Sequence, residues 1–147
     1  MAADELDLLV AQGLTAIEQE NTLLAMMHFE NAARIRRTPT VLSCLGFCIA
    51  KEHGQLQKAS SLCLEAIHQE PNVPLHYLNL ARVQRLAGHR LRAIKILQMG
   101  LKQPGNQQIV AELKQLGIRK PPLFVQLSRD HPLNKLGGKF FARLGLR

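Results

Sequence analysis

Apolar and polar positions recur along the chain with the period of amphipathic helices. Leu80, Val83 and Leu86, for example, fall on one face of a helix, and three of the four residues between them are polar. Gly and Pro residues lie between such segments, where they end helices. The pattern predicts helices at residues 5–18, 22–36, 40–52, 57–69, 75–87, 90–102 and 107–116.

The first six of these helices form pairs that repeat every 34 residues. The repeats span about residues 6–39, 40–73 and 74–107. Gly88 separates the helices of the third pair and is expected to have the positive φ that ends a helix. Three columns of small or apolar residues keep the 34-residue interval: Ala25, Ala59 and Ala93; Phe29, Cys63 and Leu97; and Ala32, Ala66 and Gly100.

Small residues in these columns have a packing role. Ala or Gly at a helix crossing lets two backbones approach closely, so we expect each repeat to stack on the next and the repeats to share one continuous core. The second repeat departs from the others, because Gly46 precedes Ala59 by 13 residues whereas Ala81 precedes Ala93 by 12. The extra residue predicts a bulge or a longer turn between Gly46 and Gly54.

The third repeat carries a series of residues that resembles the tetratricopeptide repeat family, whose unit is a helix pair of this length. The series departs from the family pattern in having Ala81 in place of Gly and Gly100 in place of Ala. The resemblance covers about residues 6–107 and implies an all-α, right-handed superhelix of helical hairpins. The residues that carry it are Tyr77-Leu78-Asn79-Leu80-Ala81, Leu86-Ala87-Gly88, Ala93, Leu97 and Pro104.

The resemblance also implies a concave groove, lined by the first helix of each repeat, that holds a peptide or a partner helix. The groove is apolar at one end and cationic at the other, which suits a ligand with an apolar and an acidic part. The family's clamp for a C-terminal carboxylate is not reproduced, because the second repeat has Ser43 and Phe47 at the clamp positions. The implied groove residues are Val10, Leu14, Ile17, Ser43, Phe47, Asn79, Arg82 and Arg85.

Residues 107–116 are expected to form a capping helix for the last repeat. Its apolar stripe is made of Ile109, Val110, Leu113 and Leu116. Its glutamines and Glu112 are expected to face away from the stack, because the cap of a repeat array needs a polar outer side. Residues 1–117 are therefore predicted to be one unit of three repeats and a cap.

Residues 118–147 form a Pro-containing, basic, amphipathic tail. Three alternatives stay open for it: it folds back on the repeats, it lies on an anionic membrane surface, or it binds another macromolecule such as a nucleic acid. Its apolar stripe is made of Leu133, Leu136, Phe140 and Leu144. Its basic residues include Arg119, Lys120, Lys135, Lys139 and Arg143.

Charge is divided unevenly along the chain. Residues 1–73 hold 5 Lys and Arg and 9 Asp and Glu, which gives −4, whereas residues 74–147 hold 14 and 2, which gives +12. This asymmetry suggests an anionic partner for the C-terminal half, or contact between the halves. Phosphate binding needs such positive charge, but residues 82–95 offer no aromatic side chains on which bases could stack.

The sequence contains no catalytic signature. It has no glycine-rich phosphate loop and no serine in a nucleophile elbow. Cys44 and Cys48 lie one helical turn apart, with His53 and His68 as candidates to complete a metal site, but burial of cysteine as a small apolar residue is the favoured interpretation. The six histidines are scattered and expected at the surface or partly buried. We therefore predict a protein that is not an enzyme and has no cofactor or metal.

Amino-acid composition further limits the fold class and the cellular location that we expect. Apolar residues make up 46% of the chain but aromatic residues only 4%, which disfavours a large β-sandwich or barrel. No apolar run is long enough to cross a membrane, and the acidic N-terminus is unlike a secretory signal. The odd number of cysteines, three, disfavours a disulfide framework. These features favour a helical protein of the cytoplasm.

The leading functional hypothesis is a non-catalytic protein-interaction or scaffold module. It would bind a peptide or a partner protein of acidic character in the groove. The alternative is an adaptor that binds an anionic membrane surface or a nucleic acid through the basic C-terminal half. Self-association is a further alternative.

Overall fold

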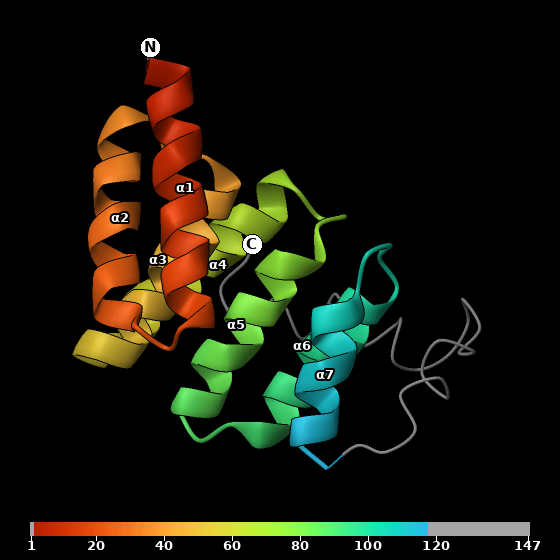
Figure 1. Ribbon diagram of the computed structural model, residues 1–147. Coiled ribbons are helices and arrows are strands. Elements are labelled where there is room, and N and C mark those ends of the chain that lie inside the picture. Colours follow the sequence, from red (N-terminus) through yellow and green to blue (C-terminus); the bar gives the residue numbers. More distant parts are fainter. Residues whose placement is uncertain (1, 118–147) are drawn as a thin grey trace.

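The computed structural model of the chain describes residues 2–117, which contain helices and no strand (Figure 1). Each helix predicted from the sequence is present, and the largest shift is at the first, which begins at Ala2. The helices are α1 (Ala2–Glu18), α2 (Thr22–Ile35), α3 (Pro39–His53), α4 (Leu56–Gln69), α5 (Pro74–Leu86), α6 (Arg90–Leu101) and α7 (Gln107–Gln115).

Local capping interactions explain where several helices begin and end. The side chains of Asn21 and Thr38 accept hydrogen bonds from backbone N–H groups in the first turns of α2 and α3, at 3.2 and 3.3 Å. Pro39 follows Thr38 in the first turn of α3, where its missing N–H costs nothing. Gly54 and Gly88 follow the C-terminal ends of α3 and α5 with φ values of 66° and 83°, which confirms the positive φ predicted for Gly88.

All nine residues of the three repeating columns are buried. Their burial explains the 34-residue interval, since each column places a small or apolar side chain at a helix contact. The sequence led us to expect one continuous core. The core is grouped into clusters, but the two large ones are linked by a shared side chain. It divides into one large cluster centred on α1–α3 and another centred on α4–α7, and Leu75 packs against both. A third, small cluster joins Leu6, Ala32 and Val41.

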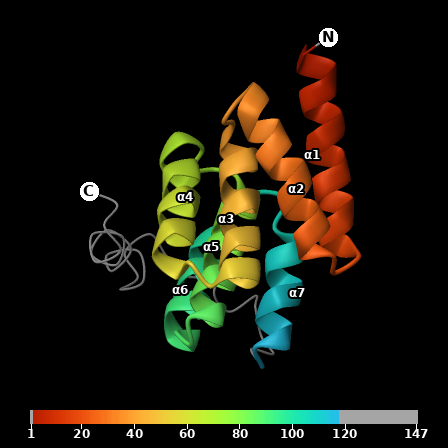
Figure 2. The ribbon, with the colours of Figure 1, turned by 90° about the vertical axis from the view of Figure 1, so that its left-hand side faces the viewer.

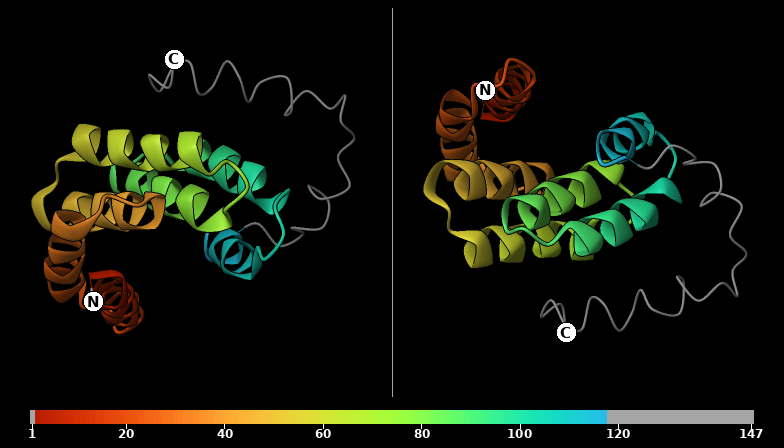
Figure 3. Two further views of the ribbon diagram at one scale, coloured as in Figure 1. Left: turned by 90° about the horizontal axis from the view of Figure 1, so that it is seen from above. Right: turned by 90° about the horizontal axis from the view of Figure 1, so that it is seen from below.

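Neighbouring helices pack closely, but the two junctions between hairpins differ. Helix α3 packs along α5, and α4 also packs along α5, whereas α3 meets the first hairpin through α2. Helices α1 and α3 have few if any close backbone contacts. Figure 3 shows α1 and α2 nearer to end-on than α3–α6, so the first hairpin is tilted relative to the others. Figure 2 shows α7 on the same side of the molecule as α1.

Two glycines tighten the hairpins themselves. A Cβ atom on Gly46 of α3 would lie 2.8 Å from the backbone carbonyl oxygen of Ala59 in α4. A Cβ atom on Gly13 of α1 would lie 2.6 Å from the ring of Phe29 in α2. We expected small residues to allow stacking between repeats, but at these two positions they allow close approach within a repeat.

The predicted bulge or longer turn after Gly46 is wrong. Helix α3 continues without interruption to His53, and Gly54 N–H bonds to the carbonyl of Ala50 as in a regular helix end. The extra residue of the second repeat therefore lengthens α3. A helix absorbs one residue at low cost where its end projects from the core, as at His53, which is exposed.

No helix within residues 2–117 is long and apolar enough to cross a membrane. The tail residues singled out in the sequence, Arg119, Lys120, Lys135, Lys139 and Arg143, lie outside the described residues.

Replacing Gly46 with Ala is expected to lower the free energy of unfolding by about 1–3 kcal/mol, the usual cost of overpacking, although Ala favours helix. The added methyl would meet a backbone oxygen that cannot move without shifting α4. Urea unfolding followed by circular dichroism measures the change. Gly54→Asn is the matched control, because nothing lies within 4 Å of that site and Asn tolerates positive φ. A Gly46→Ala protein as stable as the parent would contradict the tight crossing.

Candidate functional site

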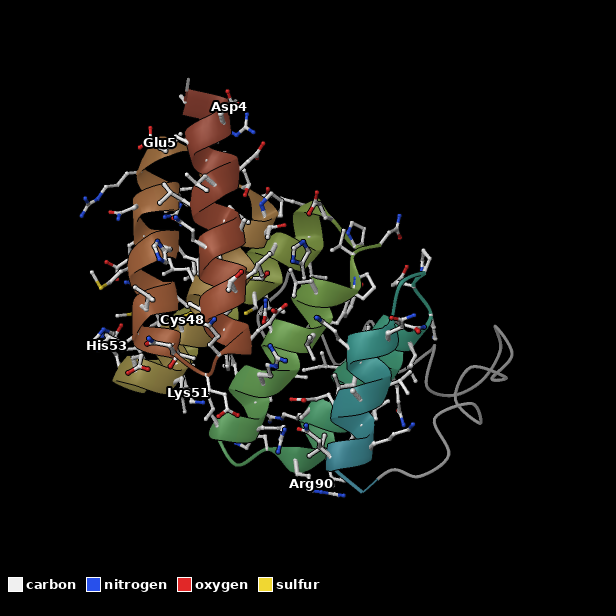
Figure 4. The ribbon with its side chains drawn as sticks, in the orientation of Figure 1. Asp4, Glu5, Cys48, Lys51, His53 and Arg90 are labelled. Carbon is white, nitrogen blue, oxygen red and sulfur yellow. The ribbon has the colours of Figure 1, made fainter. Side chains whose placement is uncertain are left out.

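A cavity of about 430 Å³ opens on the inner face of the molecule, between the C-terminal parts of α1, α3 and α5 and the capping helix α7. We call it the trough. Figure 4 shows Lys51, one of its residues, near the C-terminal end of α1. The trough is lined by Ile17, Glu20, Thr22, Phe47, Lys51, Arg82, Arg85, Leu86, Glu112 and Gln115.

Half of the predicted groove residues line the trough and half do not. Ile17, Phe47, Arg82 and Arg85 come together there, from three repeats. Val10 and Leu14 are partly buried and pack instead against the core cluster of α1–α3.

Ser43 and Asn79, which we also expected to face the groove, are fully buried between α3 and α5. Asn79 donates a hydrogen bond to the Ser43 Oγ at 3.2 Å, so the two side chains close the groove at this point. The physical reason is the close packing of α3 on α5, which leaves no room for a ligand between them. The prediction that these two residues bind a ligand in the groove is therefore wrong.

Arg82 is held in the trough by two contacts. Its guanidinium carbon lies 5.2 Å from the centre of the Phe47 ring, a cation–π distance. Its Nε lies 3.6 Å from the Glu112 carboxylate. Arg85 donates a hydrogen bond to the same carboxylate oxygen at 3.0 Å. One carboxylate therefore fixes both arginines.

Glu112 also lies elsewhere than the sequence predicts. It was expected to face away from the stack, but it is buried and turns inward to meet α5. The apolar stripe of α7 could not reveal this, because the partner side chains are more than 25 residues away. The charge count could have done so, since Glu112 is the only acidic residue in 74–117 and two arginines share one face of α5.

The lining of the trough combines apolar and charged groups. Ile17, Phe47 and Leu86 supply apolar surface, and Leu86 is exposed. The cations of the lining outnumber the carboxylates by one, because Lys51, Arg82 and Arg85 face Glu20 and Glu112. The arrangement can hold a large apolar side chain and a carboxylate at the same time.

A second polar cluster is buried between α3 and α5. His76 has no exposed surface, and its Nε2 and Nδ1 lie 2.8 Å from the Glu70 carboxylate and from the Ser43 Oγ. The hydrogen-bond network assigns the proton to Nε2, which donates to Glu70, while Ser43 donates to Nδ1 and accepts from Asn79. The expectation that the histidines lie at the surface or are partly buried is wrong for His76, which is fully buried.

Burial lowers the pKa of His76 below its ordinary value, because an imidazolium without water is unfavourable, and the Glu70 carboxylate opposes this shift only in part. Ser43, His76 and Glu70 are connected like a nucleophile, a base and a carboxylate. Ser43 is completely buried, so no substrate reaches its Oγ. We interpret the cluster as the polar layer that joins the second and third repeats.

The cysteines are all buried in the core. Burial raises the pKa of Cys44 and of Cys48 to about 12, and it raises that of Cys63 as well. Cys63 fills a packing column as predicted. Within residues 2–117 no three potential ligands of the His, Cys, Asp and Glu types are grouped so that they could hold a metal ion.

No protein-family model matches this chain, and no curated protein matches its sequence.

Glu112→Gln is expected to lower the free energy of unfolding by about 1–2 kcal/mol, because it removes the charge that both arginines bind. This loss of stability is smaller than for fully buried ion pairs, because the side chains of Arg82 and Arg85 are 26% and 37% exposed and water screens their charges. Urea unfolding measures the loss. Glu65→Gln, on the exposed side of α4, is the control and should change stability little. Equal stability of the Glu112→Gln and parent proteins would show that the ion pairs do not hold α7.

Acidification is expected to destabilise the fold through His76. The folded-state pKa lies below the ordinary 6.5, so above pH 6.5 the residue is neutral in both states. As the pH falls below 6.5, the unfolded chain takes up the proton first, and stability is lost until the folded-state pKa is reached.

This loss is measured by urea unfolding between about pH 7 and pH 5.5, around the ordinary histidine pKa. His76→Asn should be less stable than the parent at neutral pH but should show a flatter pH dependence. His68→Asn, at an exposed position of α4, should keep the parent's slope. An unchanged slope in the His76→Asn protein would overturn the assignment.

Proposed function

We propose that this chain is a non-catalytic interaction module of three tetratricopeptide-type hairpins and a cap, arranged as a right-handed superhelix. Its ligand is a peptide segment or a partner protein, bound in the trough. The observation that supports the proposal is the open cavity between α1, α3, α5 and α7, lined by both apolar and cationic side chains. Its volume of about 430 Å³ falls in the range of sites that bind small ligands or single peptide side chains.

The ligand presents a large apolar side chain next to an acidic one. Leu86 and Ile17 receive the apolar side chain, because they contribute apolar surface near the mouth of the cavity. Lys51 and Arg82 receive the carboxylate. Charge contacts of this kind set specificity and the rate of association more than affinity, so the apolar contact provides most of the binding energy.

Glu112 contributes by holding the arginines in place before the ligand arrives. Because Arg82 is already stacked on Phe47 and bonded to Glu112, little side-chain entropy is lost on binding. Arg82 and Arg85 are therefore poor positions for a test by charge reversal, since the change would also break the contact between α5 and α7.

Lys51→Glu combined with Leu86→Asp is expected to weaken ligand binding by at least about tenfold, or about 1.4 kcal/mol. Peptides selected on the parent protein from a random library should pair a large apolar residue with Asp or Glu, and fluorescence anisotropy gives their affinities. Lys51 and Leu86 are exposed, so folding should be preserved.

The matched control is Leu91→Asp with Lys95→Glu. It makes the same chemical changes on exposed positions of α6, outside the trough. Binding should be unchanged in this variant. Equal loss of binding in both variants, or none in either, would contradict a ligand site in the trough.

A further inference from the structure

The charge of the described structure is divided sharply between the first hairpin and the rest. Residues 2–35, which form α1 and α2, hold six acidic residues and one basic residue, which gives −5. Residues 36–117 hold four acidic and eleven basic residues, which gives +7. Figure 4 shows two of the acids, Asp4 and Glu5, at the N-terminal end of α1. The first hairpin is therefore the most acidic part of the described residues.

The same hairpin carries most of the exposed apolar surface. Six large apolar side chains are exposed in the described residues, and Leu8, Leu23, Leu24 and Met27 of α1 and α2 are four of them. Leu23 and Met27 are 54% and 55% exposed and lie one turn apart on α2.

A second cavity, of about 300 Å³, lies between α1 and α2 and is lined by no residue of α3. Its lining is largely neutral and includes Ala11, Thr15 and Leu24, with His28 at one side. A groove between two antiparallel helices that includes an exposed leucine has the shape that a third amphipathic helix fills. We call this groove the end face.

The two ends of the repeat stack differ in whether another helix covers them. At the C-terminal end, α7 buries Ile109 and Leu113 and leaves its glutamines Gln107, Gln108 and Gln115 exposed. Such a polar outer cover is what terminal repeats need. At the N-terminal end, no helix within residues 2–117 covers the end face.

We propose that the end face is the docking site for residues 130–144 of the same chain. This segment carries Leu133, Leu136, Phe140 and Leu144 on one stripe, which matches an apolar groove. Residues 118–147 hold seven basic residues and one acidic residue, which gives +6. The segment is therefore attracted by the hairpin of charge −5 and repelled by residues 36–117 of charge +7.

The same charges argue against the trough as the docking site. Three cations face two carboxylates in the trough, and Glu112 is already paired with two of the cations. A basic segment would gain nothing there. The proposal is therefore independent of the ligand proposed for the trough.

The connection is long enough for docking within one chain. Residues 118–129 link the end of α7 to the docking segment and can span about 40 Å when extended. The path from α7 to α1 crosses four packed helix pairs, α7–α5, α5–α3, α3–α2 and α2–α1, each with axes about 8–10 Å apart. Figure 3 shows α1 and α7 on the same side of α3 and α5, which shortens the path.

Carbodiimide cross-linking of the full chain tests the docking, because it joins lysine amines to carboxylates in direct contact. Mass spectrometry should find Lys135 or Lys139 joined to acidic residues of residues 2–35, and not to Glu65 on α4. Leu24→Lys should lower the yield of these cross-links by about tenfold, because it replaces an apolar contact with a cation on the end face. In 1 M salt the cross-links should also weaken, because the Debye length falls to about 3 Å.

Leu91→Lys is the matched control. Leu91 is also an exposed apolar residue, at 70%, but it lies on α6 in the basic part of the molecule, so the cross-links should persist. Tail lysines joined mainly to acids outside residues 2–35, or equal yields in the Leu24→Lys and Leu91→Lys proteins, would overturn the proposal. Cross-links between labelled and unlabelled chains in an isotopic mixture would overturn docking within one chain and indicate a second copy as the occupant.

Discussion

Helix α3 is buried on every side, and the rest of the fold is arranged around this constraint. Each residue from Val41 to Ala50 is buried, so each face of the helix must match a neighbour. Apolar side chains meet that requirement against α2 and α4. Toward α5 the helix presents Ser43, whose hydroxyl must be hydrogen-bonded because it is out of reach of water. His76 and Asn79 supply the partners, and the repeat spacing brings them opposite Ser43.

The two junctions on either side of α3 give the inner surface its shape. The polar layer draws α5 close and closes the surface between Ser43 and Asn79. On the other side, partly buried side chains of α1 pack against the α3 cluster while the two backbones stay apart. The cavity therefore opens beyond the polar layer, where Phe47 supports Arg82 and where α7 supplies Glu112.

The helices and their pairing could be predicted from the sequence because they follow from local periodicity and from residues such as Gly88 that end helices. Burial of the residues in the repeating columns could also be predicted, because small and apolar residues recur there at a fixed interval. Which side chains are exposed on the inner surface could not be predicted, because exposure depends on the distance between neighbouring helices. Ser43 and Asn79 are buried, whereas Arg82 is partly exposed. Glu112 was misplaced because its orientation depends on charges far away in sequence.

The tilt of the first hairpin has a mechanical consequence. Helix α1 forms one wall of the trough, yet its hairpin is joined to α3 through α2 and the short connection Arg36-Arg37-Thr38. The opposite wall, α5 with α7, is braced by ion pairs and by the polar layer. The width of the trough therefore depends on the angle at which the first hairpin meets α3, whereas the position of its other wall is set by these polar contacts.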